Sequence, residues 1–204
     1  MSDCKPTYHH GDLRQALIAG AIAAIAERDP SQLSLRAIAR RIGVSHAAPY
    51  RHFADKEALL AAVAEEGFHG LRAALTAGIA AAEPEPLRQL EASGVAYVAY
   101  ALSHPHHYRV MFGSCQGSPE RYPDLAAAGQ TAFQIIIDLV AKGQAAGVVR
   151  TGEPGELAQV AWSLVHGLAM LAIDGYLPEG SPPTLDALIA LATRSLIEGF
   201  QSRP

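Results

Sequence analysis

The chain has 204 residues, of which half are apolar and 18% are charged, and its formal net charge is −4 at pH 7. This length and composition can bury a sizeable core and suit one small domain joined to one larger domain. The chain has only two cysteines, Cys4 and Cys115, which argues against a disulfide-stabilised protein. We see no apolar leader and no long uninterrupted apolar stretch, which argues against export and against a membrane span. We therefore expect a cytoplasmic protein.

Helical periodicity begins near residue 11. Apolar residues at spacings of three and four predict a first helix over residues 11–28. A second, short helix is predicted to begin at Ser34, whose hydroxyl suits an N-cap. One face of this second helix is apolar, and the other carries three arginines: Arg36, Arg40 and Arg41. We interpret the first helix as a support for the second.

A tight turn and a third helix follow. Gly43 stands where a helix end requires a left-handed residue, and Ser45 is placed to cap a helix over residues 46–53. We expect Pro49 to remove the backbone hydrogen bond to Ser45 and to leave the helix otherwise intact. A helix, a Gly-centred turn and a second helix are the parts that place side chains in the major groove of DNA.

The third helix supplies the candidates for reading DNA sequence. Groove-reading helices contact base edges with their N-terminal residues, which here are Ser45, His46, Ala47 and Ala48. The two alanines suit contact with thymine methyl groups. Lys56, in the first turn of a fourth helix capped by Asp55, is expected to hold a phosphate. The full set expected to contact the DNA backbone is Ser34, Arg36, Tyr50, Arg51, His52 and Lys56.

The charge distribution agrees with this placement. Residues 1–60 hold eight Lys or Arg and six Asp or Glu, whereas residues 61–204 hold eight and fourteen. The N-terminal part is therefore net positive and the remainder is net negative. Such a small positive surplus predicts binding to DNA through a few placed contacts rather than through a broad cationic field.

The rest of the chain also has helical periodicity, with no strand pattern, repeat or low-complexity tract. The predicted fold is all-α with about nine helices. A three-helix DNA-binding domain with a helix-turn-helix is expected over residues 1–57, and a larger helical ligand-binding and dimerisation domain over residues 58–204. The helices expected after residue 55 cover residues 56–81, 86–103, 108–112, 123–146, 155–175 and 183–201.

The last two predicted helices are apolar on more than one face. A helix that is apolar all round is buried, and one face within a single chain would not cover these two. We therefore predict a homodimer that pairs both helices with their copies in a second chain. The alternative is that the two helices fill the core of a monomer.

Several motifs resemble those of the TetR family of bacterial transcriptional regulators. The resemblance rests on Gly43-Val44-Ser45, Tyr50, His52-Phe53, Lys56-Glu57 and the stretch from Tyr8 to Arg14. It implies a ligand-responsive repressor that acts as a homodimer on a palindromic operator. Two residues depart from the family pattern: Ala47 replaces a frequent Gly, and Pro49 replaces a frequent large residue.

The C-terminal part resembles a TetR subgroup named for Trp, His and Gly. Trp162, His166 and Gly167, with His104-Pro105 and Met111-Phe112-Gly113, carry this resemblance. A small apolar effector is expected in a cavity with polar anchors, although plain core is the alternative for each of its residues. The candidate lining residues are Tyr97, Tyr100, Met111, Phe112, Phe133, Trp162, His166 and Met170.

Other functions have weaker support. The His9-His10 and His104, His106 and His107 clusters lack acidic or Cys partners at ligand spacing, so we expect no metal and no other cofactor. Cys115 has no adjacent cation or nearby second Cys, which favours an inert thiol over a redox sensor. No catalytic motif is present, so we do not expect an enzyme. A transcriptional activator or a redox- or metal-responsive regulator of the same fold stays an alternative, and a helical interaction module would leave the basic unit unexplained.

Overall fold

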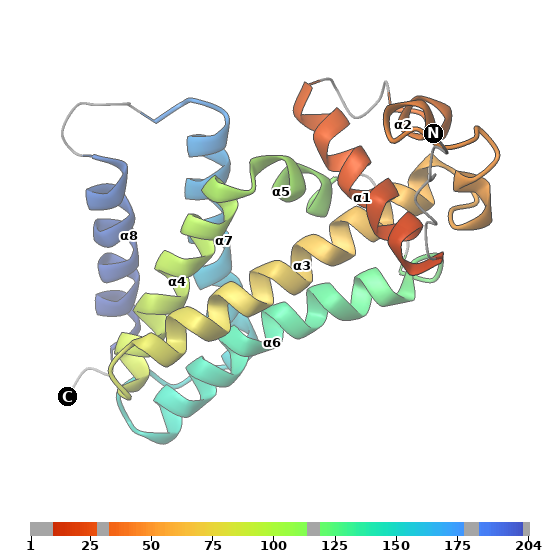
Figure 1. Cartoon of the computed structure of the whole chain (residues 1–204). Helices are drawn as coiled ribbons and strands as arrows, with labels where there is room; N and C mark the ends of the chain where they lie inside the picture. The colour runs from red at the N-terminus through yellow and green to blue at the C-terminus, as the bar shows by residue number, and fades with distance from the viewer. Residues whose placement is uncertain (1–9, 28–32, 114–118, 178–183, 202–204) are drawn as a thin grey trace. The chain divides into compact units, whose positions relative to one another are not determined.

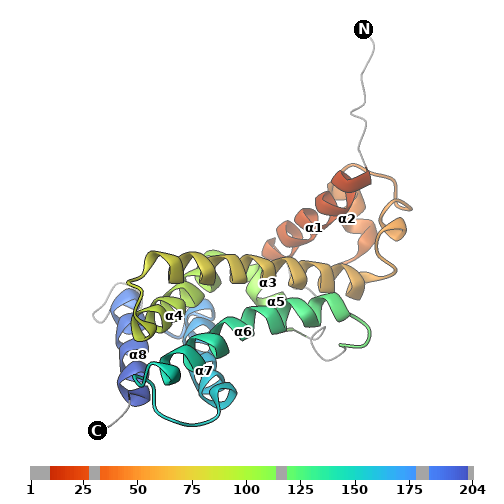
Figure 2. The same cartoon turned by 90° about the horizontal axis from the view of Figure 1, so that it is seen from below.

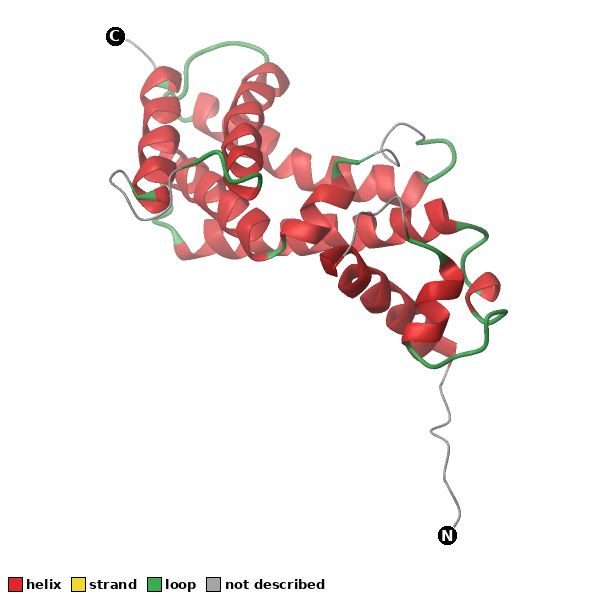
Figure 3. Cartoon of the chain, turned by 90° about the horizontal axis from the view of Figure 1, so that it is seen from above, coloured by secondary structure: helices red, strands yellow, loops and turns green. Residues whose placement is uncertain are grey.

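The computed structural model describes residues 10–27, 33–113, 119–177 and 184–201. Within these ranges the chain forms eight α-helices and one 3₁₀ helix (Figure 1). Helices and loops account for the described residues in Figure 3, and the one pairing of extended backbone among them is an isolated antiparallel bridge between Val149 and Gln201. The predicted all-α fold is confirmed.

The chain divides into two compact units. Helices α3 (Lys56–Ala81) and α6 (Pro123–Ala145) contribute residues to both. The sequence does not predict that a segment from beyond residue 100 joins the N-terminal unit. The first unit comprises Met1–Gly67 with His106–Ala126, and the second comprises Phe68–Pro105 with Ala127–Pro204.

The first unit packs α1 (His10–Glu27), α2 (Leu35–Arg41), the first turns of α3 and α5 (Pro105–Met111) around one core. The helices approach closely at glycines. A Cβ on Gly67 of α3 would lie 2.6 Å from Cγ of Met111 on α5, so a larger residue would push these two helices apart. The most deeply buried side chains of this unit are Leu17, Ile18, Ile38, Leu59, Val63, Tyr108 and Met111.

The second unit is built on α4 (Pro86–Ser103), α7 (Pro154–Ile173) and α8 (Leu185–Phe200), which contact one another pairwise and lie side by side in Figure 2. Gly94 allows α4 and α8 to approach closely, because a Cβ there would lie 2.9 Å from Cγ2 of Thr193 on α8. A core of buried residues fills the unit: Leu90, Leu139, Val140, Val149, Leu157, Ala158, Ala161, Ile197 and Phe200.

Local chemistry explains where the helices begin and end. Pro86, Pro123 and Pro154 each stand at the first position of a helix, where a missing N–H costs nothing. Gly147 follows α6 with a φ of +71°, which a residue with a Cβ rarely adopts. The expected ends of these helices are confirmed to within a few residues.

The predicted helix over residues 46–53 is wrong. Only Pro49–Arg51 is helical there, as a single 3₁₀ turn preceded by Ala48 rather than by a capping Ser45. Pro49 has no N–H to donate to the Ser45 carbonyl, and the N–H of Ala48 donates to that carbonyl instead, at 3.0 Å. The chain therefore forms a single 3₁₀ turn at Pro49–Arg51 in place of a continuous α-helix.

Candidate nucleic-acid interface

The candidate interface begins with α2 and its capped start. The backbone of Ser34 is extended, and its Oγ accepts the Ala37 N–H at 3.1 Å, which confirms the expected N-cap. Gly43 ends the helix region with a φ of +74°, and the Val44 N–H donates to the Ala39 carbonyl at 2.9 Å. These contacts fix the direction in which the chain leaves α2.

The segment between α2 and α3 exposes the residues expected to read bases. Ser45, His46 and Ala47 are exposed, and Ala48 is half-buried. Behind them Pro49 and Phe53 are buried, and the Phe53 N–H donates to the Pro49 carbonyl at 2.9 Å. The segment is thus anchored by two apolar side chains and presents its N-terminal residues to solvent.

The candidates for backbone contact surround this segment. Tyr50 is 50% exposed, and Arg36 and Arg51 are exposed as well. His52 and Lys56 are half-buried. The structure therefore leaves the hydroxyl of Tyr50 and the two guanidinium groups accessible to a phosphate.

One arginine of α2 is already engaged. Arg41 donates two hydrogen bonds to the carboxylate of Glu27 at the end of α1, each at 2.8 Å. The hydrogen bonds to this carboxylate raise the pKa of Arg41 above its ordinary value. The sequence places Arg41 on an outward basic face, but its charge is compensated within the unit.

The start of α3 is also capped by a side chain. Asp55 Oδ1 accepts the Ala58 N–H at 2.7 Å, and Asp55 Oδ2 accepts a hydrogen bond from Arg121 Nη2 at 2.6 Å. Arg121 lies within the segment of the first unit that comes from beyond residue 100. The sequence predicts the cap but gives no signal for the second partner, which is 66 positions away.

Four of the expected effector residues meet in the second unit. Trp162 Nε1 donates to Tyr97 Oη at 3.0 Å, and Tyr97 Oη lies 3.1 Å from Nδ1 of His166. The ring of Phe133 packs edge-on against Trp162, with centroids 6.2 Å apart. Because indole N–H only donates, Tyr97 Oη is the acceptor from Trp162 and keeps a proton that it can donate to His166. Burial lowers the pKa of His166, which agrees with a neutral acceptor nitrogen.

The other four lie in different surroundings. Tyr100 stacks on His104, with ring centroids 4.5 Å apart. Met111 and Phe112 belong to the first unit, where Met111 is buried and Phe112 packs against Tyr108. Met170 is half-buried on α7.

Gly167 is not a point of close helix packing, because nothing outside the nearby backbone of its own helix lies within 4 Å of the position that a Cβ would take.

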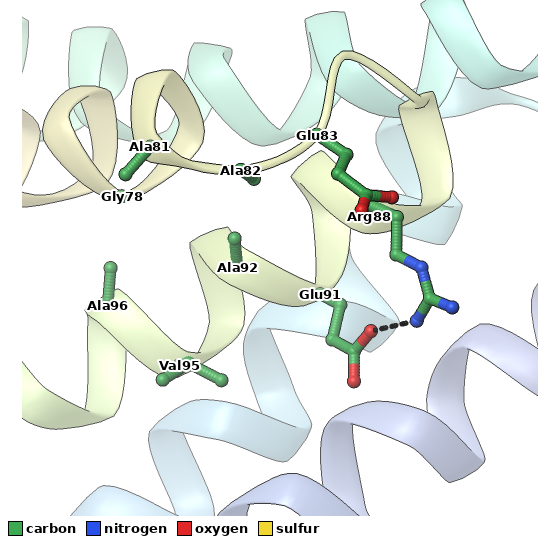
Figure 4. A pocket seen from close by; sticks show the side chains of 9 residues that line it. All are labelled: Gly78, Ala81, Ala82, Glu83, Arg88, Glu91, Ala92, Val95 and Ala96. Carbon is green, nitrogen blue, oxygen red and sulfur yellow. Dashed lines mark hydrogen bonds and ion pairs between the residues drawn. The ribbon is translucent and has the colours of Figure 1, made fainter.

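An open groove of about 590 Å³ lies between the end of α3 and the first half of α4 (Figure 4). Arg88 and Glu91 form an ion pair of 3.1 Å at one side of it. None of the eight expected effector residues lines this groove. Its lining residues are Gly78, Ala81, Ala82, Glu83, Arg88, Glu91, Ala92, Val95 and Ala96.

The described part of the chain holds no group of three His, Cys, Asp or Glu side chains that is arranged to bind a metal. His104 instead packs on Tyr100 and hydrogen-bonds with Ser103 at 2.9 Å. Cys4, His9 and Cys115 lie outside the described residues.

Helices α6 and α7 are long and apolar enough to cross a membrane by length and composition alone. The core helices of soluble proteins pass the same test, so this is weak evidence for a membrane protein. In α7 only 33% of the apolar window is buried within the chain, which leaves apolar surface uncovered.

Comparison with known families decides the identity of the chain. Residues 17–63 match the family described as "Bacterial regulatory proteins, tetR family", and residues 90–196 match "Tetracyclin repressor-like, C-terminal domain". The second match alone covers more than half of the chain. The chain belongs to the TetR family. It is therefore a transcriptional regulator that binds DNA, and members of this family bind operators as dimers.

Solved structures agree with a TetR fold. A protein of unknown function from Rhodococcus sp. RHA1 is 36% identical, with a TM-score of 0.85 over 97% of this chain and 100% of that chain. A TetR/AcrR family regulator from Thermobifida fusca YX-ER1 is 26% identical, with a TM-score of 0.70 over 94% and 100%. A tetR family protein from Rhodococcus RHA1 is 22% identical, with a TM-score of 0.75 over 94% and 98%. No match was found among curated proteins.

Proposed function

We propose that this TetR-family chain is a cytoplasmic, non-enzymatic repressor that binds a palindromic operator as a homodimer and releases it when a small apolar molecule binds. The DNA-binding part of this proposal is supported by the segment after α2. Ser45, His46 and Ala47 are exposed there, and Pro49 and Phe53 are buried. Exposed residues after the turn that follows α2 are in the position from which helix-turn-helix proteins contact base edges.

The residues of this segment have separate roles in the proposal. Ser45 and His46 hydrogen-bond to base edges, and the methyl groups of Ala47 and Ala48 contact thymine. Ser34 keeps its hydroxyl proton, because its oxygen is the acceptor in the N-cap, and so can still donate to a phosphate. The remaining phosphate contacts come from Arg36, Tyr50, Arg51, His52 and Lys56.

The last two helices form the dimer interface in this proposal. Three large apolar side chains of α7 are exposed: Val160 at 52%, Leu164 at 37% and Leu171 at 46%. At 3.6 residues per turn they fall within about 40° of one another on one face of the helix. Leu191 of α8 is 57% exposed. An apolar face of this kind favours pairing with a second copy over the alternative of a monomer core.

The effector site of the proposal is the hydrogen-bonded cluster of Tyr97, Trp162 and His166 with Phe133. Its aromatic surface and ordered polar atoms are the features of a small-molecule site. The proposed assignment to the Trp-His-Gly subgroup rests on the motif residues Trp162, His166 and Gly167 of α7. Tyr100 and Met170 of the same unit complete the proposed lining, whereas Met111 and Phe112 belong to the first unit and are not part of it.

The proposed mechanism uses the division of the chain, which we place at residues 1–57 for DNA binding and 58–204 for effector binding and dimerisation. An effector that favours one arrangement of α3 changes the spacing of the two reading segments. Operator binding needs that spacing near one DNA turn, roughly 34 to 36 Å, so a small pivot releases the DNA.

Selection of bound duplexes from random DNA, followed by a mobility shift with the recovered site, tests this function. The proposal expects a palindromic motif that is bound by two chains. Recovery of no motif by the purified dimer would contradict it. Small molecules that raise the melting temperature of the dimer and weaken the mobility shift would identify the effector class.

A further inference from the structure

The ion pair of Arg121 with Asp55 joins the segment before α6 to the start of α3 within the first unit. The two carboxylate oxygens of Asp55 have different tasks, since Oδ1 accepts the Ala58 N–H and Oδ2 accepts from Arg121 Nη2. The guanidinium carbon of Arg121 also lies 5.3 Å from the ring centroid of Tyr122. These contacts hold Arg121 beside the capped end of α3.

The charges at this helix end explain why the pair matters for DNA binding. Asp55, Lys56 and Glu57 together carry a formal charge of −1, which opposes a phosphate beside Lys56. Coulomb repulsion between this surplus negative charge and a phosphate a few ångström away weakens the contact with DNA. Arg121 brings the formal charge of this helix end to zero.

We propose that Arg121 is a positioning residue of the DNA-binding surface, which neutralises Asp55 and so allows Lys56 and the first turn of α3 to hold a DNA phosphate. This inference rests on the proposed phosphate contact of Lys56. It gives the segment between α5 and α6, which is far from the helix-turn-helix in sequence, a direct influence on operator affinity.

The pair contributes little to folding in this account. Its side chains are 58% and 37% exposed, and exposed ion pairs of this kind contribute little to folding stability because solvent screens their charges. Loss of Arg121 should therefore show in DNA affinity and not in thermal stability. A purely structural role would move both.

Four variants test the proposal through the dissociation constant for the recovered operator and the melting temperature. Arg121→Gln should weaken binding about fivefold, for all duplexes alike, because it exposes the Asp55 charge. Asp55→Asn in the same chain should restore affinity to within about twofold, because Asn caps a helix as well as Asp does. Arg88→Gln, which removes an arginine from the ion pair with Glu91 in the second unit, is the matched control and should change nothing.

The outcomes separate this inference from the site on which it depends. An unchanged affinity in Arg121→Gln overturns the inference, and so does a failure of Asp55→Asn to rescue it, which would mean that Arg121 touches the phosphate itself. Lys56→Ala reports on the underlying site. If Lys56→Ala binds like the unaltered chain, the phosphate site of the proposed function is wrong, whatever Arg121 does.

Discussion

His166 shows how burial and hydrogen bonding together set the state of one residue. Tyr97 Oη accepts a hydrogen bond from Trp162 Nε1 and hydrogen-bonds with Nδ1 of His166. Burial disfavours the charged imidazolium form of His166. The neutral imidazole is therefore part of the folded cluster.

This state predicts a pH dependence of stability. Burial lowers the pKa of folded His166 below the unfolded value of 6.5, so the unfolded state takes up the proton first as the pH falls. Above pH 6.5 the imidazole is neutral in both states, so His166 does not change the free energy of unfolding there. Below pH 6.5 that free energy falls as the pH falls, until the pH reaches the pKa of His166 in the folded protein. Melting temperatures should drop between pH 7.5 and pH 5.5, and less so in His166→Gln. His69→Gln, at an exposed position, is the control; equal drops in all three proteins would contradict the account.

The proposed contacts of Lys56 and His46 differ in what they do to DNA binding. A phosphate contact carries no sequence information, so Lys56→Ala should weaken binding to every duplex and lower the slope of affinity against salt by about one. His46→Ala should mainly relax the preference at particular base pairs. Titrations of operator and scrambled duplexes at several salt concentrations measure both effects. If both variants merely lower the melting temperature, the assigned roles are wrong.

At the scale of elements, local signals predicted most of the fold. Ser34, Gly43 and the helix-starting prolines act within a few residues of their positions, and the helices begin and end near them. The pairs of Arg41 with Glu27 and Arg121 with Asp55 depend on tertiary packing that no local pattern encodes. The sequence predicts the loss of the hydrogen bond to Ser45, but the expectation that the helix stays otherwise intact is wrong, because the Ala48 N–H takes the Ser45 carbonyl and the chain forms a 3₁₀ turn.

Pro49→Ala tests the effect of this proline on the reading segment. The restored N–H can donate to the Ser45 carbonyl, so the segment should gain an α-helical turn and shift its first residues. We expect a changed base preference with little change in affinity for non-specific DNA. Amide exchange at residues 49–52 and a repeated selection from random duplexes measure the change. An identical recovered motif would show that the 3₁₀ geometry does not set the preference.

At the scale of the whole molecule, a single chain leaves an apolar face of α7 exposed to solvent. Leu164→Glu would place a charge in the middle of the proposed interface, where burial of an unpaired charge is costly. Sedimentation at micromolar concentration should change from dimer to monomer, and operator affinity should fall at least about a hundredfold, since two half-sites are no longer bound together. Val95→Glu, at a 41% exposed position on α4, is the matched control. A dimeric Leu164→Glu would contradict the interface.

The account as a whole depends on the segment from Ser45 to Lys56 touching DNA, and photo-crosslinking tests this most directly. A photoreactive residue in place of His46 should crosslink to the bound operator, whereas the same residue in place of Tyr176, which is 77% exposed in the second unit, should not. An operator complex that forms normally and crosslinks from position 176 but not from position 46 would contradict the account.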